Sequence, residues 1–157
     1  MKKVTRYFVV LIFFTLFSFQ ESSAELLKPN IKLKPFDVVK IQLVALKNNN
    51  KPYKNAGIEQ TWEFAHPSNK NFTGPLSRFI KLLNDEGYNI LLNHIEHKVV
   101  EVYKSEEKFI YEVTILDREK NFFKYNWQIE KFANDGPLNN CWLTTSVSLP
   151  VSLGSSI

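Results

Sequence analysis

The sequence predicts an α+β domain in which helices come first and an antiparallel sheet follows. Up to Gly87, apolar residues recur every three or four positions, which is the period of one face of a helix. After Gly87 they alternate with polar residues, which is typical of strands with one buried face. Helices grouped before strands indicate the α+β class. We expect two to three N-terminal helices packed on a curved four-stranded antiparallel sheet, in a cone-like arrangement.

Residues 1–24 are predicted to be a secretory signal peptide and not part of this fold. Three of the first six residues are Lys or Arg, and residues 8–17 form an apolar run that is short for a bilayer span. Small side chains at Ser22 and Ala24 suit a signal peptidase. We expect cleavage after Ala24 and export to the periplasm, the medium or the thylakoid lumen. The alternative is an uncleaved N-terminal anchor.

The remaining chain has the composition of one ordinary globular domain. Cleavage would remove three of 20 basic and one of 16 acidic side chains, which leaves a net charge of +2 and little support for nucleic-acid binding. Cys141 is the single cysteine, so an internal disulfide is excluded, and its apolar neighbours favour a buried thiol. We expect a linker over residues 25–34, the α+β domain over 35–150 and a C-terminal tail over 151–157.

The first helix is expected to begin at Pro35 and to end near Asn48. Proline fits a first helical turn because its missing N–H is not needed there, and Asp37 complements the helix dipole. The apolar face that would pack on the sheet consists of Phe36, Val39, Leu43 and Leu46.

Two further helices are expected before the sheet. One covers about residues 58–65 and ends there because the residue before Pro67 disfavours the helical conformation. Residues 66–72 are rich in turn formers and are expected to be a loop. Thr73 is then expected to be the N-cap of a helix that Gly87 closes.

Four strands are expected in the second half of the chain. Their alternation is clear in the last three and weaker in the first, where a bulge is expected at Val99 and Val100. A turn is expected at 117–121 and a longer connection from 134. The four ranges are 95–103, 108–115, 123–130 and 141–149.

Short stretches spread over the chain together form a recognisable pattern. They are residues 35–39, 42–46, 57–59, 64–65, 69–70, 73–76, 78–79 and 141–147. This pattern resembles an uncharacterised family, domain of unknown function 4864, and it covers about residues 35–149. The resemblance implies a fold similar to that of nuclear transport factor 2. Because the family has no established activity, it implies no catalytic residue.

The best candidate for a binding site is the region around Trp62, His66, Asn69 and Arg78. These side chains could wall a pocket, and Asn69 and Arg78 could contact an anion near the start of a helix. The alternative is purely structural, with Asn69 in a turn and His66 capping the end of its helix.

Two groups of titratable residues are candidates for chemistry. His66 with Glu59 or Glu63 could act as an acid/base pair at a pocket mouth. His94 and His97, three apart on a strand, would point to opposite faces, so we expect surface histidines and not a metal site. No metal and no cofactor is expected.

The function predicted is therefore binding and not catalysis. The sequence has no phosphate-binding glycine loop, nucleophile elbow, zinc-protease motif or paired cysteines. The leading hypothesis is a non-catalytic exported domain that binds a small ligand or a protein partner. The alternatives are a small isomerase, dehydratase or hydrolase, or an accessory factor of a membrane complex. We expect no nucleic-acid partner and no stable membrane span after cleavage, and a homodimer could form through apolar residues on the outer face of the sheet.

Overall fold

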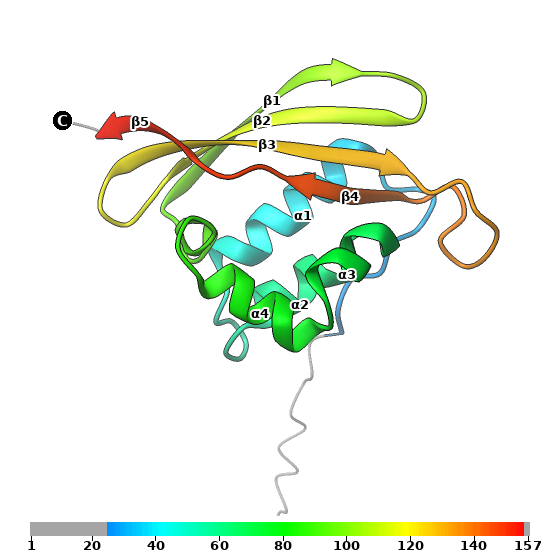
Figure 1. Cartoon of the computed structure of the whole chain (residues 1–157), viewed down its shortest axis with the longest axis horizontal. Coiled ribbons are helices and arrows are strands. Elements are labelled where there is room, and N and C mark those ends of the chain that lie inside the picture. The colour runs from blue at the N-terminus through cyan, green and yellow to red at the C-terminus, as the bar shows by residue number, and fades with distance from the viewer. Residues whose placement is uncertain (1–24, 156–157) are drawn as a thin grey trace, which may run out of the picture.

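The computed structural model describes residues 25–155, which form an α+β domain with the helices first (Figure 1). The helical elements are α1 (Pro35–Lys47), α2 (Ala56–Glu63), α3 (Pro67–Thr73), α4 (Leu76–Asn84) and the 3₁₀ turn η1 (Asn89–Leu91). The strands are β1 (Glu96–Lys104), β2 (Lys108–Leu116), β3 (Asn121–Lys131), β4 (Trp142–Val147) and β5 (Val151–Ser155). The predicted signal peptide lies outside the described residues. None of the helices in the described part of the chain has the length and apolarity needed to cross a membrane.

The sheet is antiparallel and open. Its strand order is β1-β2-β3-β4, and β5 pairs with the part of β3 that β4 leaves uncovered. Tyr111, Val113 and Ile115 of β2 lie opposite Trp127, Tyr125 and Phe123 of β3, and together they form the face directed at the helices. The opposite face carries cross-strand ion pairs, such as Lys124 to Glu112 at 3.2 Å. Pairing of two copies through that face stays a prediction.

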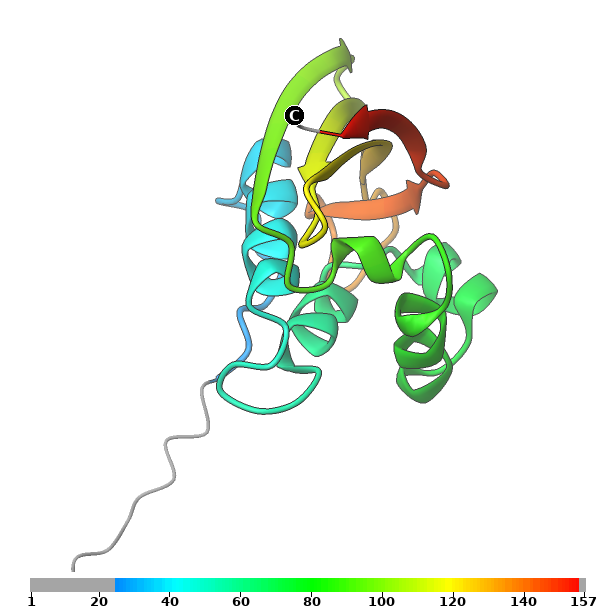
Figure 2. The same ribbon diagram turned by 90° about the vertical axis from the view of Figure 1, so that its left-hand side faces the viewer.

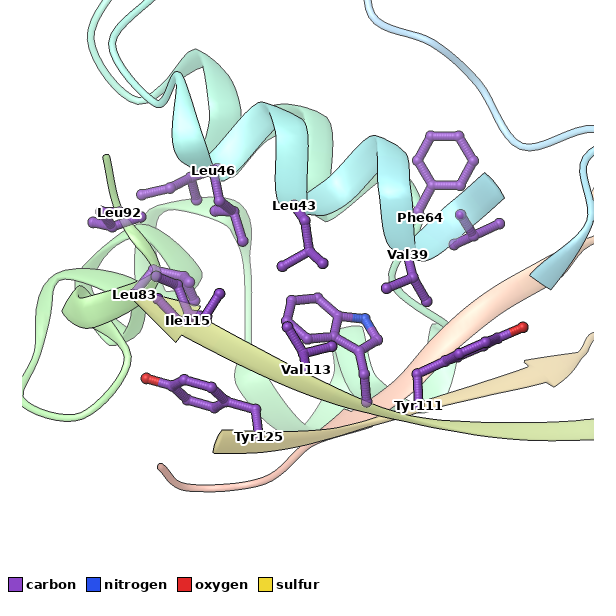
Figure 3. Close-up of a cluster of buried hydrophobic side chains, with 14 of the residues drawn as sticks. Val39, Leu43, Leu46, Phe64, Leu83, Leu92, Tyr111, Val113, Ile115 and Tyr125 are labelled. Atoms are coloured by element: carbon purple, nitrogen blue, oxygen red, sulfur yellow. The ribbon is translucent and has the colours of Figure 1, made fainter. Parts of the chain in front are cut away.

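Helix α1 packs directly on the sheet, as predicted, although Phe36 of the predicted apolar face is 47 % exposed. Asp37 accepts a hydrogen bond from the backbone N–H of Lys34 at 2.8 Å and so closes the first turn. Figure 3 shows Val39, Leu43 and Leu46 of this helix pointing toward the strand residues of the core. Each of the three is fully buried, so α1 supplies a large part of the helical side of the core. The other helices lie farther from the sheet, α4 most visibly (Figure 2).

The loop predicted over residues 66–72 is wrong, because those residues form helix α3. His66 is its N-cap: Nδ1 accepts a hydrogen bond from the backbone N–H of Ser68 at 3.1 Å. Histidine is an unusual cap, and none of the α3 residues is fully buried, so neither a cap pattern nor an apolar stripe marks the helix in the sequence. His66 therefore caps the start of α3 and not the end of α2.

Thr73 is not the N-cap of the following helix. It is the last residue of α3, and its hydroxyl donates to the carbonyl of Asn69 at 2.9 Å. Gly74 then turns the chain with φ +84°, and Pro75 precedes α4. The helix ends at Asn84, before Gly87. A threonine hydroxyl can bond the carbonyl four residues back as readily as it caps, so the local pattern was ambiguous.

The sheet differs from its prediction in three details. The β1 irregularity lies between Glu101 and Tyr103 and not at Val99 and Val100. Strand β4 is shorter than predicted, and residues predicted as part of a C-terminal tail form β5. All five β5 residues are exposed. Val151 and Leu153 alternate with Ser152 and Gly154, but this alternation is short and follows Pro150. The predicted turn after β2 is present, with the Asp117 carboxylate accepting from the N–H groups of Glu119 and Asn121.

Candidate functional site

A cavity of about 70 Å³ lies between α4 and the sheet. Helix α4 turns Phe79 and Leu83 inward, but it packs mainly on α2, whereas α1 contacts β3 and β4. The space left beneath β4 is the cavity. It is lined by Gln42, Leu46, Thr61, Ala65, Asn69, Thr73, Phe79, Leu82, Leu83, Tyr88, Leu91, Trp127, Thr144 and Val147.

The floor of the cavity is a buried network of hydrogen bonds between α1, α2 and the sheet. Gln42 Oε1 accepts from Thr144 Oγ1 at 2.6 Å and from Trp127 Nε1 at 3.0 Å. Gln42 Nε2 donates to the carbonyl of Thr61 at 3.1 Å, and Thr61 Oγ1 donates to the carbonyl of Gly57 at 2.8 Å. Because buried polar groups are costly unless paired, this network fixes the positions of its side chains.

A surface groove of about 240 Å³ continues the cavity outward. The two share five lining residues, which are Asn69, Thr73, Leu82, Tyr88 and Val147. The groove adds Ser68, Phe72, Thr145 and Ser146 at its rim. Phe72 is 85 % exposed, so a large aromatic side chain stands beside the entrance. Cavity and groove therefore form one path from the surface to the Gln42 network.

Two contacts with β4 bound the mouth of this path. At one end the segment after α2 pairs with Thr144, whose N–H donates to Phe64 and whose carbonyl accepts from the N–H of His66, both at 2.8 Å. At the other end the Tyr88 hydroxyl donates to the carbonyl of Val147 at 3.1 Å. The edge of β4 between these contacts faces the opening.

The path is electrically neutral. Among the described residues that line the cavity and the groove, none is Asp, Glu, Lys, Arg or His. The titratable group present is Tyr88, and burial raises the pKa of its hydroxyl. An ion placed here would lose its hydration without gaining a counter-charge, so the arrangement suits neutral molecules.

Of the four residues predicted to form the site, Asn69 lies in the path. Its Nδ2 donates a long hydrogen bond, 3.4 Å, to the carbonyl of Thr144. Trp62 packs on Phe79 with ring centroids 5.0 Å apart, behind the cavity wall. His66 caps α3 and Arg78 is exposed on α4, and neither lines the cavity or the groove.

The side chains predicted as an acid/base group have separate partners. Glu59 accepts from the Tyr53 hydroxyl at 2.6 Å, and Glu63 pairs with Lys28 at 2.8 Å. His66 Nδ1 is occupied by Ser68. Burial lowers the pKa of His66, partly opposed by the charge of Glu130. The three side chains therefore do not form one constellation at the mouth of the path.

The prediction that His94 and His97 are surface histidines on opposite faces is wrong for His94. It is 2 % exposed, and its Nε2 lies 2.7 Å from Nδ1 of His97. The reason is local: Asn93 has φ +55° and β1 begins at Glu96, so His94 lies in the segment between this turn and the strand, outside the strand alternation. In the described residues, no group of three potential ligands that could hold a metal ion is present.

The residues that form the floor were missed in the sequence. Gln42 follows Val39 by three and precedes Leu46 by four, so a polar residue stands within an apolar helical stripe. That was a usable signal, because such a residue is buried and needs a partner. Thr144 gave none, since it lies where the register of β3 and β4 shifts.

A scan against protein-family models, a search of curated proteins and a search of solved structures each find no match to this chain. The resemblance to family 4864 and the similarity to the nuclear transport factor 2 fold therefore stay predictions.

Proposed function

We propose that this protein is an exported, non-catalytic domain that binds a small, neutral and largely apolar molecule in the cavity beneath β4. The observation that supports it is the uncharged path that leads from the surface to a fixed hydrogen-bonding floor. Binding sites for small molecules combine apolar walls with a few placed polar groups in this way. The leader pattern of residues 1–24 supports export, and the helices-then-open-sheet order supports a fold similar to nuclear transport factor 2.

The size of the site sets the affinity to expect. The inner space of about 70 Å³ admits a few heavy atoms, and a larger molecule would extend into the groove of about 240 Å³. Very small ligands gain at most about 1.5 kcal/mol per heavy atom. At about 0.5–0.9 kcal/mol per heavy atom, below that limit, a probe of five or six heavy atoms should bind with a dissociation constant of roughly 0.1–10 mM.

The test uses Trp127, whose indole N–H lies in the floor. The full chain, including residues 1–24, is expressed with a ¹⁵N label, and the form that the cell exports is purified. Its measured mass should correspond to a chain that begins at Glu25. Three tryptophans give three indole signals. Titration with cyclopentane, cyclopentanone and pentan-1-ol should shift the Trp127 signal saturably for at least one probe.

Two matched variants on α4 locate the site. Leu82→Phe places a larger side chain in the shared part of the cavity and groove, and it should weaken probe binding about tenfold or more. Leu76→Phe changes another half-buried leucine of the same helix that does not line the path, and it should leave binding unchanged. Equal binding by both variants, or no shift of Trp127 with any probe, contradicts the proposal.

A further inference from the structure

We infer that Gln42 recognises the ligand by donating a hydrogen bond to it, so that the molecule bound is a small neutral compound with an acceptor oxygen, such as a ketone or ester carbonyl, at its inner end. This inference rests on the proposed function and specifies its ligand class. It follows from comparing the two protons of the Gln42 side-chain amide with the acceptors that they contact.

The orientation of the Gln42 amide is determined by its partners. The indole Nε1 of Trp127 can only donate, so the atom 3.0 Å from it must be the amide oxygen. The carbonyl of Thr61 can only accept, so the atom 3.1 Å from it must be the amide nitrogen. Both contacts require the same orientation, and a flipped amide would lose both.

The amide nitrogen has one proton to spare. An NH₂ group carries two protons, and the bond to Thr61 uses one of them. Among the described residues, none accepts the second proton, although Gln42 is 1 % exposed and lines the cavity. An acceptor for this second proton would add one hydrogen bond, worth about 0.5–1.5 kcal/mol, so the site favours a molecule that supplies an acceptor.

The other donors of the floor are already engaged. Trp127 Nε1 and Thr144 Oγ1 both donate to Gln42 Oε1. Thr61 Oγ1 donates to the carbonyl of Gly57. A carboxylate in this place would lack a cation, since no charged side chain is among the described residues lining the cavity. The floor therefore fits an uncharged oxygen that accepts one hydrogen bond.

The experiment compares cyclopentanone with cyclopentane, two rings that differ by the carbonyl oxygen. Transfer from water favours the hydrocarbon, so tighter binding of the ketone must come from its oxygen. We expect cyclopentanone to bind about five- to tenfold more tightly, as read from the Trp127 indole signal of the exported protein. One of the two Gln42 side-chain proton signals should shift downfield with the ketone and not with the hydrocarbon.

A substitution of Gln42 tests the role of its second amide proton directly. Gln42→Glu, measured at pH 5 where a buried carboxyl is protonated, keeps an oxygen for Trp127 and Thr144 and a proton for Thr61, but has no second proton. We expect the advantage of cyclopentanone over cyclopentane, measured on the same variant, to disappear. If this variant does not fold, the shift of the Gln42 protons in the unaltered protein decides.

The outcomes separate this inference from the function on which it rests. If cyclopentane binds as tightly as cyclopentanone, or if the ketone moves the Trp127 signal without moving a Gln42 proton, the inference is overturned while ligand binding stands. If neither ring moves the Trp127 signal, the proposed function fails as well.

Discussion

His94 shows how hydrogen bonds fix the protonation state of a buried side chain. Its Nδ1 lies 2.7 Å from the carbonyl of Leu91, which can only accept, so Nδ1 carries a proton. Its Nε2 then accepts the proton of Nδ1 of His97, also at 2.7 Å. Neutral His94 satisfies both contacts, whereas a second proton on Nε2 would face the donor of His97.

The first prediction is a pH dependence that His94 imposes on stability. Burial, with smaller effects of His97 and Lys47, lowers its pKa from the usual 6.5 to about 4, although the Leu91 carbonyl opposes this. Since the unfolded chain takes up the proton first, stability is fully present above pH 6.5 and falls as the pH drops from about 6.5 to about 4. The loss should be about 3 kcal/mol. Histidine titration by NMR should give a pKa near 4 for His94.

The control separates His94 from carboxylates that titrate in the same range. His94→Gln should be less stable at pH 7, but its free energy of unfolding should fall less between pH 7 and pH 4 than that of the unaltered protein. An NMR pKa of His94 close to 6.5 would contradict the effect of burial on this side chain.

The approach of α1 and α2 is set by the absence of one side chain. Gly57 lies in the first turn of α2 against the end of α1, and its N–H donates to the carbonyl of Asn49 at 3.0 Å. A Cβ there would clash with the backbone oxygen of Ala45 and lie 2.8 Å from Asn49 Cα. These are backbone atoms, so α2 as a whole would have to move.

The second prediction is that Gly57→Ala destabilises the protein. Alanine improves helix propensity by about 1 kcal/mol, but the backbone clash opposes it with a larger effect. We expect a net loss of about 2 kcal/mol in the free energy of unfolding, measured by urea denaturation. Ser77→Ala, on the exposed side of α4, is the control and should change stability by less than about 0.5 kcal/mol. A Gly57→Ala variant as stable as the unaltered protein would show that α1 and α2 can separate freely.

At the scale of the whole molecule, the domain is held by one apolar core without a disulfide in its described part. The core joins α1, α2, α4 and η1 to the inner face of β2 and β3. Cys141 is 1 % exposed, as predicted, and lies just before β4. Its burial raises the thiol pKa, which keeps the thiol protonated at neutral pH.

The third prediction is that Cys141 reports on opening of this core. A dithiobis-nitrobenzoate reagent should react with the folded protein at least about 100-fold more slowly than with protein in guanidinium chloride, because thiolate formation requires exposure. The rate should rise with sub-denaturing guanidinium in step with global unfolding. Rapid labelling of a protein whose amide spectrum is still folded would place Cys141 in a locally mobile segment instead.

The elements that could be predicted are those whose buried residues recur along the sequence with the period of a helix or a strand. Helix α1 and strands β2 and β3 bury one regular face each, so their apolar residues show the period. Helix α3 buries no residue fully, so no apolar period marks it. Strand β5 is fully exposed, and its short alternation of Val151 and Leu153 was assigned to the C-terminal tail. Of the residues that line the cavity, Asn69 was predicted and Gln42 was not. The prediction combined residues that lie close together in the sequence, between Trp62 and Arg78, and Gln42 lies outside that range.

The sequence by itself determined the α+β class, the placement of helices before strands and the buried faces of β2 and β3. These depend on local periodicity, which a chain carries before it folds. The tertiary structure decided where polar groups meet. Gln42 and Thr144 are 102 positions apart, and their 2.6 Å hydrogen bond exists because α1 packs beneath β4. The same packing leaves the space between β4 and α4, and a space between elements has no residue of its own to mark it in a sequence.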